Sequence, residues 1–274
     1  MDHKRIAYLG PTGSYSEIAA QNVASRMAAE LLSCDDIETV FKMVEEGSAL
    51  KGIVPIENSC EGSVYQVLDL LLQKKLYITG ECILPIEHAL LVKAGGNAAM
   101  ITQIVSHPQA LGQCRKYLKQ NFPGLPQQTA ASTAKAALQV ALSSDPIAAI
   151  ASPLTAAKYG LDILASNIND QSNNQTRFLI LSACMPPLIK PAKSTLLLRI
   201  QDRPGALYDI LGIFARRNIN LTRIESRPTR RQLGQYYFFI DIEGHVLDTR
   251  IQEALHEAAK HTLMLRILGS YPPA

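Results

Sequence analysis

The segment Ile6-Ala7-Tyr8-Leu9-Gly10-Pro11-Thr12-Gly13-Ser14-Tyr15-Ser16-Glu17-Ile18-Ala19-Ala20 indicates the fold class of this chain. Its apolar beginning, Ile6–Leu9, predicts a buried strand, and Glu17–Ala20 predicts a helix. The small and hydroxylic residues between them are typical of a strand-to-helix junction. Strand–helix units that repeat along a chain indicate an α/β domain with a mainly parallel sheet.

The same alternation continues as far as Ser182. Further strands or extended segments are predicted at Gly52–Pro55, Ile101–Val105, Gln128–Ala130, Ile147–Ala151 and Phe178–Ser182. Helices are predicted at Val64–Leu71, Pro108–Gln120, Thr133–Leu142 and Leu154–Tyr159. Leu76–Val92 is extended throughout, which indicates two lobes joined by strands with a ligand cleft between them. We expect hinges near residues 76–92 and 155–178.

A change of composition divides the chain into two domains. Three prolines stand within Met185–Ser194, a density that excludes a helix or a central strand. We expect a first domain over residues 1–183, a linker over 184–194 and a second domain over 195–274. The second domain has the βαββαβ pattern of a ferredoxin-like fold. Its elements are predicted at Thr195–Ile200, Ala206–Arg216, Asn220–Arg227, Gln235–Glu243, Asp248–His261 and Thr262–Leu268.

Composition argues against several classes of function. The 274 residues carry a net charge of +3, and the surplus lies after Ser194, where 11 Lys and Arg face 8 Asp and Glu. Because this surplus is small and has no aromatic stacking pattern beside it, we expect no nucleic-acid partner. The five cysteines and six histidines show no metal or disulfide spacing, so we expect no metal and no cofactor. No apolar run is long enough to span a bilayer and no signal peptide is recognisable, so we expect a cytoplasmic protein without membrane contact.

Four strand-to-helix junctions carry small or hydroxylic residues. They are Gly10–Ser16, Glu57–Ser63, Ser106–Gln109 and Ala131–Thr133. Free N–H groups and the helix dipole favour an anion at such places, so several of them together suit a small dicarboxylate. The alternative is that Ser, Thr and Asn are ordinary N-caps here. Glu57 and Asn58 are harder to explain in that way, because polar side chains after an apolar strand are costly without partners.

Thr176 and Arg177 stand side by side in Asn174–Phe178, at the mouth of a predicted strand. Arg177 can hold a carboxylate with two hydrogen bonds. The Thr176 hydroxyl can deliver a proton only if a cation or a hydrogen-bond relay stabilises its oxygen, and Arg177 could supply that. The alternative is a strand residue beside a solvated arginine.

Nearly the whole chain resembles the prephenate dehydratase family. Gly10–Ser16, Val54–Ser59 with Gly62, Ser106–Ala110 with Gln113, and Asn174–Phe178 resemble four motifs of that family in its order. Ser14 and Tyr15 replace a more usual Thr-Phe, and Ala131 stands where some members carry a glutamate. The resemblance implies Thr176, Arg177, Glu57 and Asn58 as catalytic residues. It implies a substrate-binding set of Thr12, Ser14, Ser59, Ser106, His107, Gln113, Ser132, Thr133 and Phe178.

The second domain resembles an ACT domain. The resemblance implies that L-Phe binds between paired ACT domains of two subunits. The residues implied at that site are Gly205, Ala206, Leu207, Asn220, Leu221, Glu225, Ser226, Arg227 and Pro228. The alternative is that Pro204 and Gly205 form a helix entry and Glu225–Pro228 a strand end.

The resemblance therefore implies a monofunctional enzyme of L-phenylalanine biosynthesis, which converts prephenate to phenylpyruvate, water and CO2. It implies inhibition by L-Phe and a homodimer or homotetramer formed through the ACT and catalytic domains. The implied fold is a two-lobed catalytic domain like that of periplasmic binding proteins, followed by the ACT domain. Two alternatives fit the same residues: an arogenate dehydratase, whose substrate has an amine in place of the side-chain keto group, and a non-enzymatic two-lobed binding protein.

Overall fold

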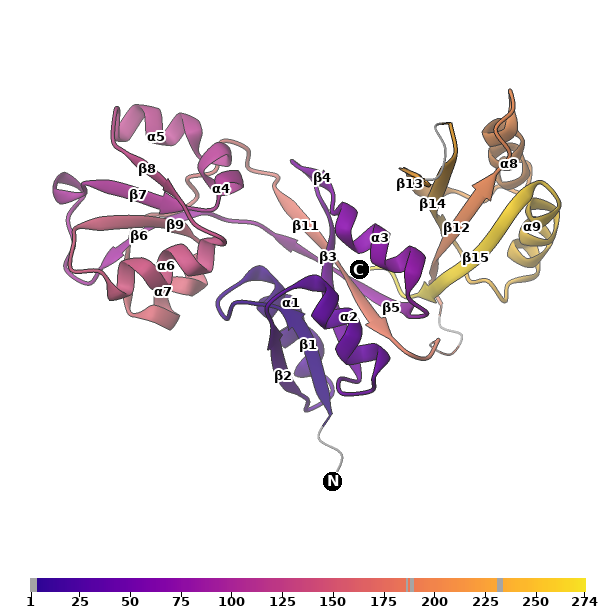
Figure 1. Ribbon diagram of the computed structural model, residues 1–274, viewed down its shortest axis with the longest axis horizontal. Coiled ribbons are helices and arrows are strands. Elements are labelled where there is room, and N and C mark those ends of the chain that lie inside the picture. Colours follow the sequence, from indigo (N-terminus) through magenta and orange to yellow (C-terminus); the bar gives the residue numbers. More distant parts are fainter. Residues whose placement is uncertain (1–3, 186, 188–189, 231–233) are drawn as a thin grey trace. The chain divides into compact units, whose positions relative to one another are not determined.

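The computed structural model describes residues 4–185, 187, 190–230 and 234–274 (Figure 1). Part of the expected linker, residues 186 and 188–189, lies outside the described residues. The chain divides into two compact units. The first comprises Met1–Val40, Ile53–Val64 and Ile83–Phe178, and the second comprises Phe41–Gly52, Tyr65–Cys82 and Leu179–Ala274.

The first sheet has the strand order β2-β1-β3-β11-β5, with β4 paired to β3. Its strands are β1 (Arg5–Leu9), β2 (Glu30–Cys34), β3 (Lys51–Asn58), β4 (Gly62–Ser63), β5 (Tyr77–Pro85) and β11 (Gln175–Ser182). The helices that follow these strands in sequence are α1 (Tyr15–Ala24), α2 (Ile37–Glu45) and α3 (Tyr65–Gln73). β1 is buried at three consecutive residues, Ile6, Ala7 and Tyr8, as expected for a parallel strand covered on both faces.

The second sheet has the order β10-β6-β9-β7-β8. Its strands are β6 (Ala89–Lys93), β7 (Gln103–Ser106), β8 (Gln127–Thr129), β9 (Ile147–Ala151) and β10 (Leu161–Ala165). Its helices are η1 (Ala98–Met100), α4 (Pro108–Gln113), α5 (Arg115–Asn121), α6 (Thr133–Leu142) and α7 (Pro153–Tyr159). β7 runs parallel to β8 and β9, whereas β6 runs antiparallel to β9 and β10. This sheet is therefore mixed, because β6 enters it directly from β5 and not through a crossover helix.

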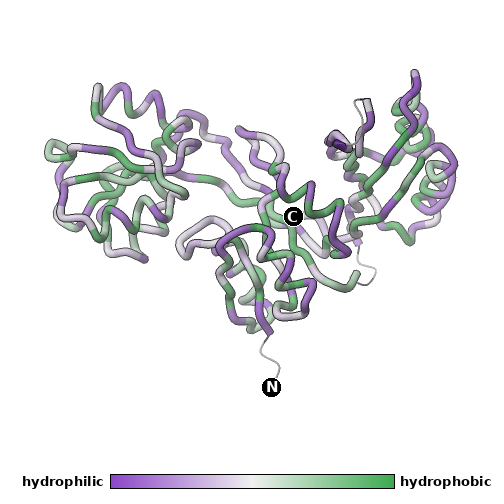
Figure 2. Tube along the Cα trace, viewed as in Figure 1, coloured by the Kyte–Doolittle hydropathy of each residue, from purple (hydrophilic) through white to green (hydrophobic). Residues whose placement is uncertain are grey.

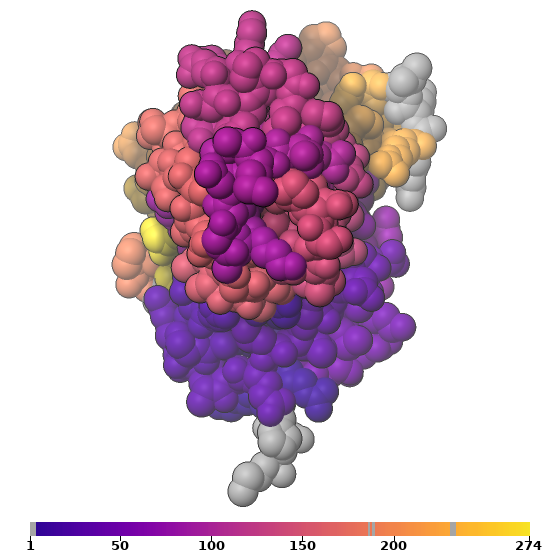
Figure 3. Space-filling view, turned by 90° about the vertical axis from the view of Figure 1, so that its left-hand side faces the viewer, coloured from indigo at the N-terminus to yellow at the C-terminus, as the bar shows by residue number. Residues whose placement is uncertain are grey.

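The core of this second lobe lies on β9, which is buried at all five residues. α6 packs against it with Ala134, Ala136, Ala137 and Val140, a set at helical spacing. The small alanines let the helix approach the sheet closely. Hydrophobic residues follow the central strands in Figure 2, and Figure 3 shows the segments of this lobe, magenta to salmon, packed together on one face.

Two chain segments connect the lobes. β5 belongs to the first sheet and β6 to the second, so residues 86–88 pass from one to the other, and residues 166–174 return between β10 and β11 (Figure 1). The expected extended crossing within Leu76–Val92 is thus confirmed. The expected two-lobed fold of the periplasmic-binding-protein kind is also confirmed.

The C-terminal part of the second unit is a four-stranded antiparallel sheet of order β13-β14-β12-β15. Its elements are β12 (Lys193–Ile200), α8 (Ala206–Ala215), β13 (Leu221–Pro228), β14 (Tyr236–Glu243), α9 (Thr249–Lys260) and β15 (Thr262–Tyr271). Both helices bury one apolar side, Ile210 and Phe214 from α8 and Ile251 and Leu255 from α9, in one cluster with the strands. The predicted βαββαβ order is confirmed.

Several local features differ from the prediction. The single helix expected over Pro108–Gln120 is two helices, because the backbone leaves the helical region at Cys114, where φ is −113° and ψ is 15°. β2, α2 and β10 were not predicted. β11 begins at Gln175, so Thr176 and Arg177 lie inside the strand and not before it. Every helix of the described residues is too short or too polar to pass through a bilayer.

Candidate active site

Asn58 lies at the turn between β3 and β4, where it pairs with Gly62 in a tight hairpin. Its Oδ1 accepts the backbone N–H groups of Cys60 at 2.9 Å and Glu61 at 3.1 Å. These two bonds orient the amide, so that Nδ2 faces β11 and donates to Thr176 Oγ1 at 2.9 Å. The Thr176 oxygen is an acceptor in this bond. Its own proton therefore remains available for another acceptor.

Glu57 and Arg177 form a second pair across the same two strands. Their closest charged atoms, Arg177 Nη1 and Glu57 Oε2, are 4.0 Å apart, and the Arg177 side chain is only 11% exposed. Since successive strand residues point to opposite faces, Arg177 faces away from the side on which Asn58 contacts Thr176. The adjacency of Thr176 and Arg177 in sequence led us to expect that Arg177 stabilises the hydroxyl. The observed contact to that hydroxyl comes from Asn58 instead.

Ser59 fastens the hairpin to β11. Its backbone N–H donates to Gln175 O at 2.9 Å, and its hydroxyl accepts the Gln175 N–H at 2.9 Å and donates to Asn173 O at 3.1 Å. These bonds engage both the backbone N–H and the hydroxyl of Ser59. The serine therefore holds Asn58 and Thr176 in register.

Gln113, at the end of α4, connects this cluster to the second lobe. Asn174 Oδ1 accepts Asn58 Nδ2 at 2.8 Å, and Asn174 Nδ2 donates to Gln113 Oε1 at 2.9 Å. Gln113 Nε2 donates to Glu61 Oε1 at 3.2 Å. The amide orientations of Asn58, Asn174 and Gln113 thus form one connected relay that includes the Thr176 hydroxyl.

His88 holds the far end of the relay. Its Nε2 lies 2.9 Å from Gln113 Oε1, and because a carbonyl oxygen only accepts, Nε2 carries the proton. Nδ1 is buried without a hydrogen-bond partner among the described residues. Burial lowers the pKa of His88. The imidazole is therefore neutral, with a single defined tautomer.

A cavity of about 280 Å³ opens beside the relay. It is lined by Cys60, Glu61, Gly112, Gln113, Lys116, Asn169, Asp170, Gln171 and Asn174. Lys116 is a cation in this set, and the amides supply both donors and acceptors. No three His, Cys, Asp or Glu side chains of the described chain gather as metal ligands would.

The other expected substrate-binding residues are engaged in local structure. Ser14, His107 and Ser132 are N-caps of α1, α4 and α6, and burial lowers the pKa of His107. Ser106 is fully buried and donates to Ile150 O at 2.6 Å, Thr133 is the first residue of α6, and Phe178 is buried in the core. The Thr12 carbonyl accepts the Tyr159 hydroxyl at 2.9 Å. The structure therefore brings Asn58, Ser59, Gln113 and Thr176 together, and leaves these seven outside the relay.

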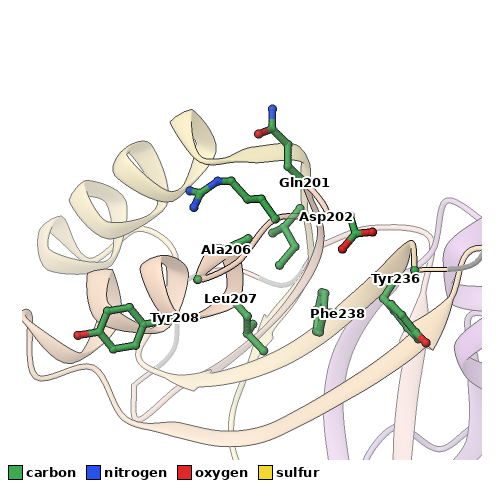
Figure 4. Close-up of a pocket in the computed structure, with 11 residues that line it drawn as sticks. Gln201, Asp202, Ala206, Leu207, Tyr208, Tyr236 and Phe238 are labelled. Carbon is green, nitrogen blue, oxygen red and sulfur yellow. The ribbon is translucent and has the colours of Figure 1, made fainter.

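A second cavity, of about 490 Å³, lies in the C-terminal domain (Figure 4). Gly205, Ala206 and Leu207 line it at the start of α8. The lining also includes Asp202, Tyr208, Tyr236 and Phe238. Gly205 is the N-cap in the left-handed region, with φ 79°, which an L side chain rarely adopts. Of the nine residues expected to hold L-Phe, Gly205, Ala206 and Leu207 line this cavity.

The remaining six lie along or beside β13. Asn220 Nδ2 donates to Glu243 Oε1 at 3.0 Å, and Leu221 begins the strand. Glu225, Ser226, Arg227 and Pro228 form its end. Arg227 makes two hydrogen bonds to Asp69 of α3, at 2.7 and 2.8 Å, and its guanidinium lies 4.6 Å from the centroid of the Tyr65 ring.

Comparison with known proteins shows the family to which the chain belongs. A family model described as prephenate dehydratase matches residues 6–185, and an ACT domain model matches residues 194–260. The chain belongs to the prephenate dehydratase family. It is 42% identical to prephenate dehydratase of Methanocaldococcus jannaschii, with 98% of each chain covered. It is 38% identical to arogenate dehydratase 2 of Petunia hybrida, over 98% of this chain and 71% of the relative.

A solved structure of the family has the same fold. The prephenate dehydratase of Arthrobacter aurescens, in complex with L-Phe, superposes with a TM-score of 0.89 at 37% identity, over 97% of this chain and 89% of that one. The two-lobed fold and the ACT domain found here are therefore those of the family.

Three residues of the relay, Asn174, His88 and Glu61, were not predicted as site residues. Asn174 lies in the motif that contains Thr176, and an amide beside that threonine was a usable signal. His88 gave no signal, because a lone histidine in an extended segment has no spacing that points to a site. Glu61 was likewise passed over, although it sits in a predicted junction.

Proposed function

We propose that the protein is a prephenate dehydratase, which converts prephenate to phenylpyruvate, water and CO2. Family membership over both domains supports this function. The Thr176 hydroxyl is the single observation that carries the mechanism, because Asn58 donates to its oxygen and leaves its proton for the substrate. Aromatisation of the ring supplies the driving force, so the residues mainly have to deliver one proton and align the substrate.

In the proposed step, the ring carboxylate leaves as CO2 and its C–C electron pair moves into the ring. The C–O bond at the opposite ring carbon breaks, and the proton of Thr176 converts the departing hydroxide to water. Asn58 Nδ2 stabilises the negative charge that develops on Thr176 Oγ1. Solvent then returns a proton to Thr176. Atoms and charge balance with one proton consumed for each prephenate.

The remaining assignments are positional. Gln113 and Asn174 hold the relay and line the cavity of about 280 Å³, where Lys116 lies among the amides and beside the carboxylates of Glu61 and Asp170. We assign Glu57 and Arg177 to positioning the strand pair β3 and β11 from its other face, so that Asn58 and Thr176 stay in register. The junctions that include Thr12, Ser14, Ser106, His107, Ser132 and Thr133 would bind the substrate through backbone N–H groups. Phe178 anchors β11.

We assign residues 1–183 to the catalytic domain, 184–194 to a linker and 195–274 to a regulatory ACT domain, with hinges near 76–92 and 155–178. L-Phe inhibits the enzyme by binding at Gly205–Leu207, where the cavity of about 490 Å³ combines an apolar wall with the first turn of α8. Residues Asn220–Pro228 would complete the site from β13, in a homodimer or homotetramer formed through the ACT and catalytic domains.

The five cysteines are all thiols, which suits the reducing cytoplasm that we assign to the protein.

Arogenate is the second candidate substrate, favoured by the 38% identity to a petunia arogenate dehydratase. The two substrates undergo the same ring chemistry and differ at the side chain. The experiment is ultraviolet detection of phenylpyruvate formed from prephenate, and of phenylalanine formed from arogenate, with and without L-Phe. Phenylpyruvate formation that L-Phe suppresses supports the proposal. A protein that acts on arogenate and leaves prephenate unchanged contradicts it.

A further inference from the structure

Three side chains of α7 contact the loop Gly10–Ser16 or the carboxylate beneath it. Thr155 Oγ1 donates to Gly13 O at 3.2 Å, and the Tyr159 hydroxyl donates to Thr12 O at 2.9 Å. Lys158 Nζ donates to both carboxylate oxygens of Glu17, at 2.9 and 3.0 Å. Residues 155, 158 and 159 share one helix face because of their spacing. α7 belongs to the second lobe and the loop to the first.

Glu17 completes the arrangement from the first turn of α1. Its Oε2 accepts the Gly13 N–H at 2.5 Å, in addition to the Lys158 ammonium. Both backbone polar groups of Gly13 are therefore bound to side chains, one from each lobe. Gly13 has φ +88°, and a Cβ there would meet Thr155 Cγ2 and Tyr159 Cε2 at 3.5 Å. Such a Cβ would be in ordinary van der Waals contact with both side chains, so α7 lies directly against Gly13.

The charges of this cluster matter for a substrate with two carboxylates. The Glu17 side chain is 12% exposed and lies beneath a loop that, under the proposed function, meets the substrate. An unneutralised carboxylate there would repel prephenate, and screening by water is weak at such burial. Lys158 removes that repulsion, because its ammonium sits on both oxygens of Glu17.

We propose that α7 is a clasp between the lobes, in which Lys158 is a positioning residue for substrate binding. It acts through Glu17 and Gly13, with Thr155 and Tyr159 as supporting contacts. The clasp holds the loop Gly10–Ser16 in place and neutralises the Glu17 carboxylate beneath it. This role rests on the proposed function, and it predicts an effect on KM and not on kcat, since the Thr176 relay lies on other elements.

The test compares K158M with the double variant E17Q/K158M. We expect K158M to raise KM for prephenate about tenfold while kcat changes less than about threefold, because an unpaired, largely buried carboxylate remains. We expect E17Q/K158M to recover most of that loss, since the neutral amide that replaces the Glu17 carboxylate still accepts the Gly13 N–H. Damage to the fold would not be repaired by a second substitution.

Y159F, which removes one hydroxyl, should give a smaller KM increase in the same direction. K119M is the matched control, an exposed lysine of α5 in the same lobe.

Hydrogen exchange of the peptide that covers residues 10–16 tests the clasp without any substrate. Faster exchange in K158M, with wild-type exchange in K119M, supports the clasp. Unchanged exchange in K158M overturns it, whether or not prephenate proves to be the substrate. In active enzyme, an unchanged KM in K158M, or a KM that E17Q fails to restore, overturns the charge-masking role.

Discussion

Asn58 and Thr176 are 118 residues apart in sequence, and Asn58 Nδ2 donates a 2.9 Å hydrogen bond to Thr176 Oγ1. The direction of this bond is set by the Cys60 and Glu61 N–H groups on the other side of the amide. It makes the threonine an acceptor within the protein and so a donor toward the substrate. The chemistry assigned to Thr176 depends on that direction.

The substitution N58D reverses the bond. The aspartate carboxylate accepts the Thr176 hydroxyl proton, which is then no longer directed at the substrate. The negative charge of the aspartate also repels a dianionic substrate. We expect kcat to fall at least about a hundredfold, or about 2.7 kcal/mol of barrier. Steady-state kinetics of phenylpyruvate formation measure this. N121D adds the same charge at an exposed helix end and should leave kcat near the wild-type value; equal losses in the two variants would refute the assignment.

His88 should make stability depend on pH. Burial lowers its pKa from the usual 6.5, so the unfolded chain binds the proton first as pH falls. Protonation therefore favours unfolding, and stability declines as pH drops through about 6.5 and levels off below the folded-state pKa. Chemical denaturation between pH 5 and 8 measures this decline, which His107 shares in sign. H88Q should show a shallower decline than the wild type, and an unchanged slope would contradict the assignment.

Asp69 should contribute to stability through Arg227 and Arg230. Both guanidinium groups bond to its carboxylate, and the bond from Arg227 lowers the pKa of Asp69. Since the folded pKa is depressed, this stability is present above the unfolded pKa and is lost as pH falls through the folded value. We expect D69N to lower the free energy of unfolding by about 1 to 2 kcal/mol at pH 7. E45Q, which breaks the more exposed ion pair of Glu45 with Lys74, should lower the free energy of unfolding by less. A D69N protein as stable as the wild type would refute this contribution.

Gly205 should matter for L-Phe and not for turnover. A methyl group at this position would project into open space beside the cavity, and the backbone at φ 79° strains any L residue. We expect G205A to weaken L-Phe binding at least about fivefold, measured by calorimetry, with a backbone cost of about 1 kcal/mol. Gly124 has a similar φ of 76° with nothing near its Cβ, so G124A is the control for strain alone. Wild-type L-Phe affinity in G205A would exclude Gly205–Leu207 as the effector site.

Local sequence patterns predicted most elements of this fold, and they did so where burial is strong. Ile147–Ala151 and Thr133–Leu142 were predicted to the residue, because one is continuously buried and the other has a clear helical period. β2 and β10 were missed because each has few buried residues, and exposed strands lack an apolar pattern. The break at Cys114 was missed because no proline marks it.

The site was predictable only in part, because a motif names residues and does not show which of them touch. Asn58, Gln113 and Thr176 came from motifs, and the structure joins them through Asn174 and His88. The pairing of Thr176 with Asn58, in place of Arg177, follows from strand alternation once β3 and β11 are known to be neighbours. The pairing of β3 with β11 is a long-range contact that local patterns in one sequence do not reveal.

The most direct test of the central claim is single-turnover formation of phenylpyruvate by T176A and T176S, with folding checked by circular dichroism. We predict that T176A loses at least about a hundredfold in rate, while T176S, which keeps a hydroxyl on Asn58, stays within about tenfold of the wild type. A near-normal rate in T176A would contradict the assignment of Thr176 as the proton donor.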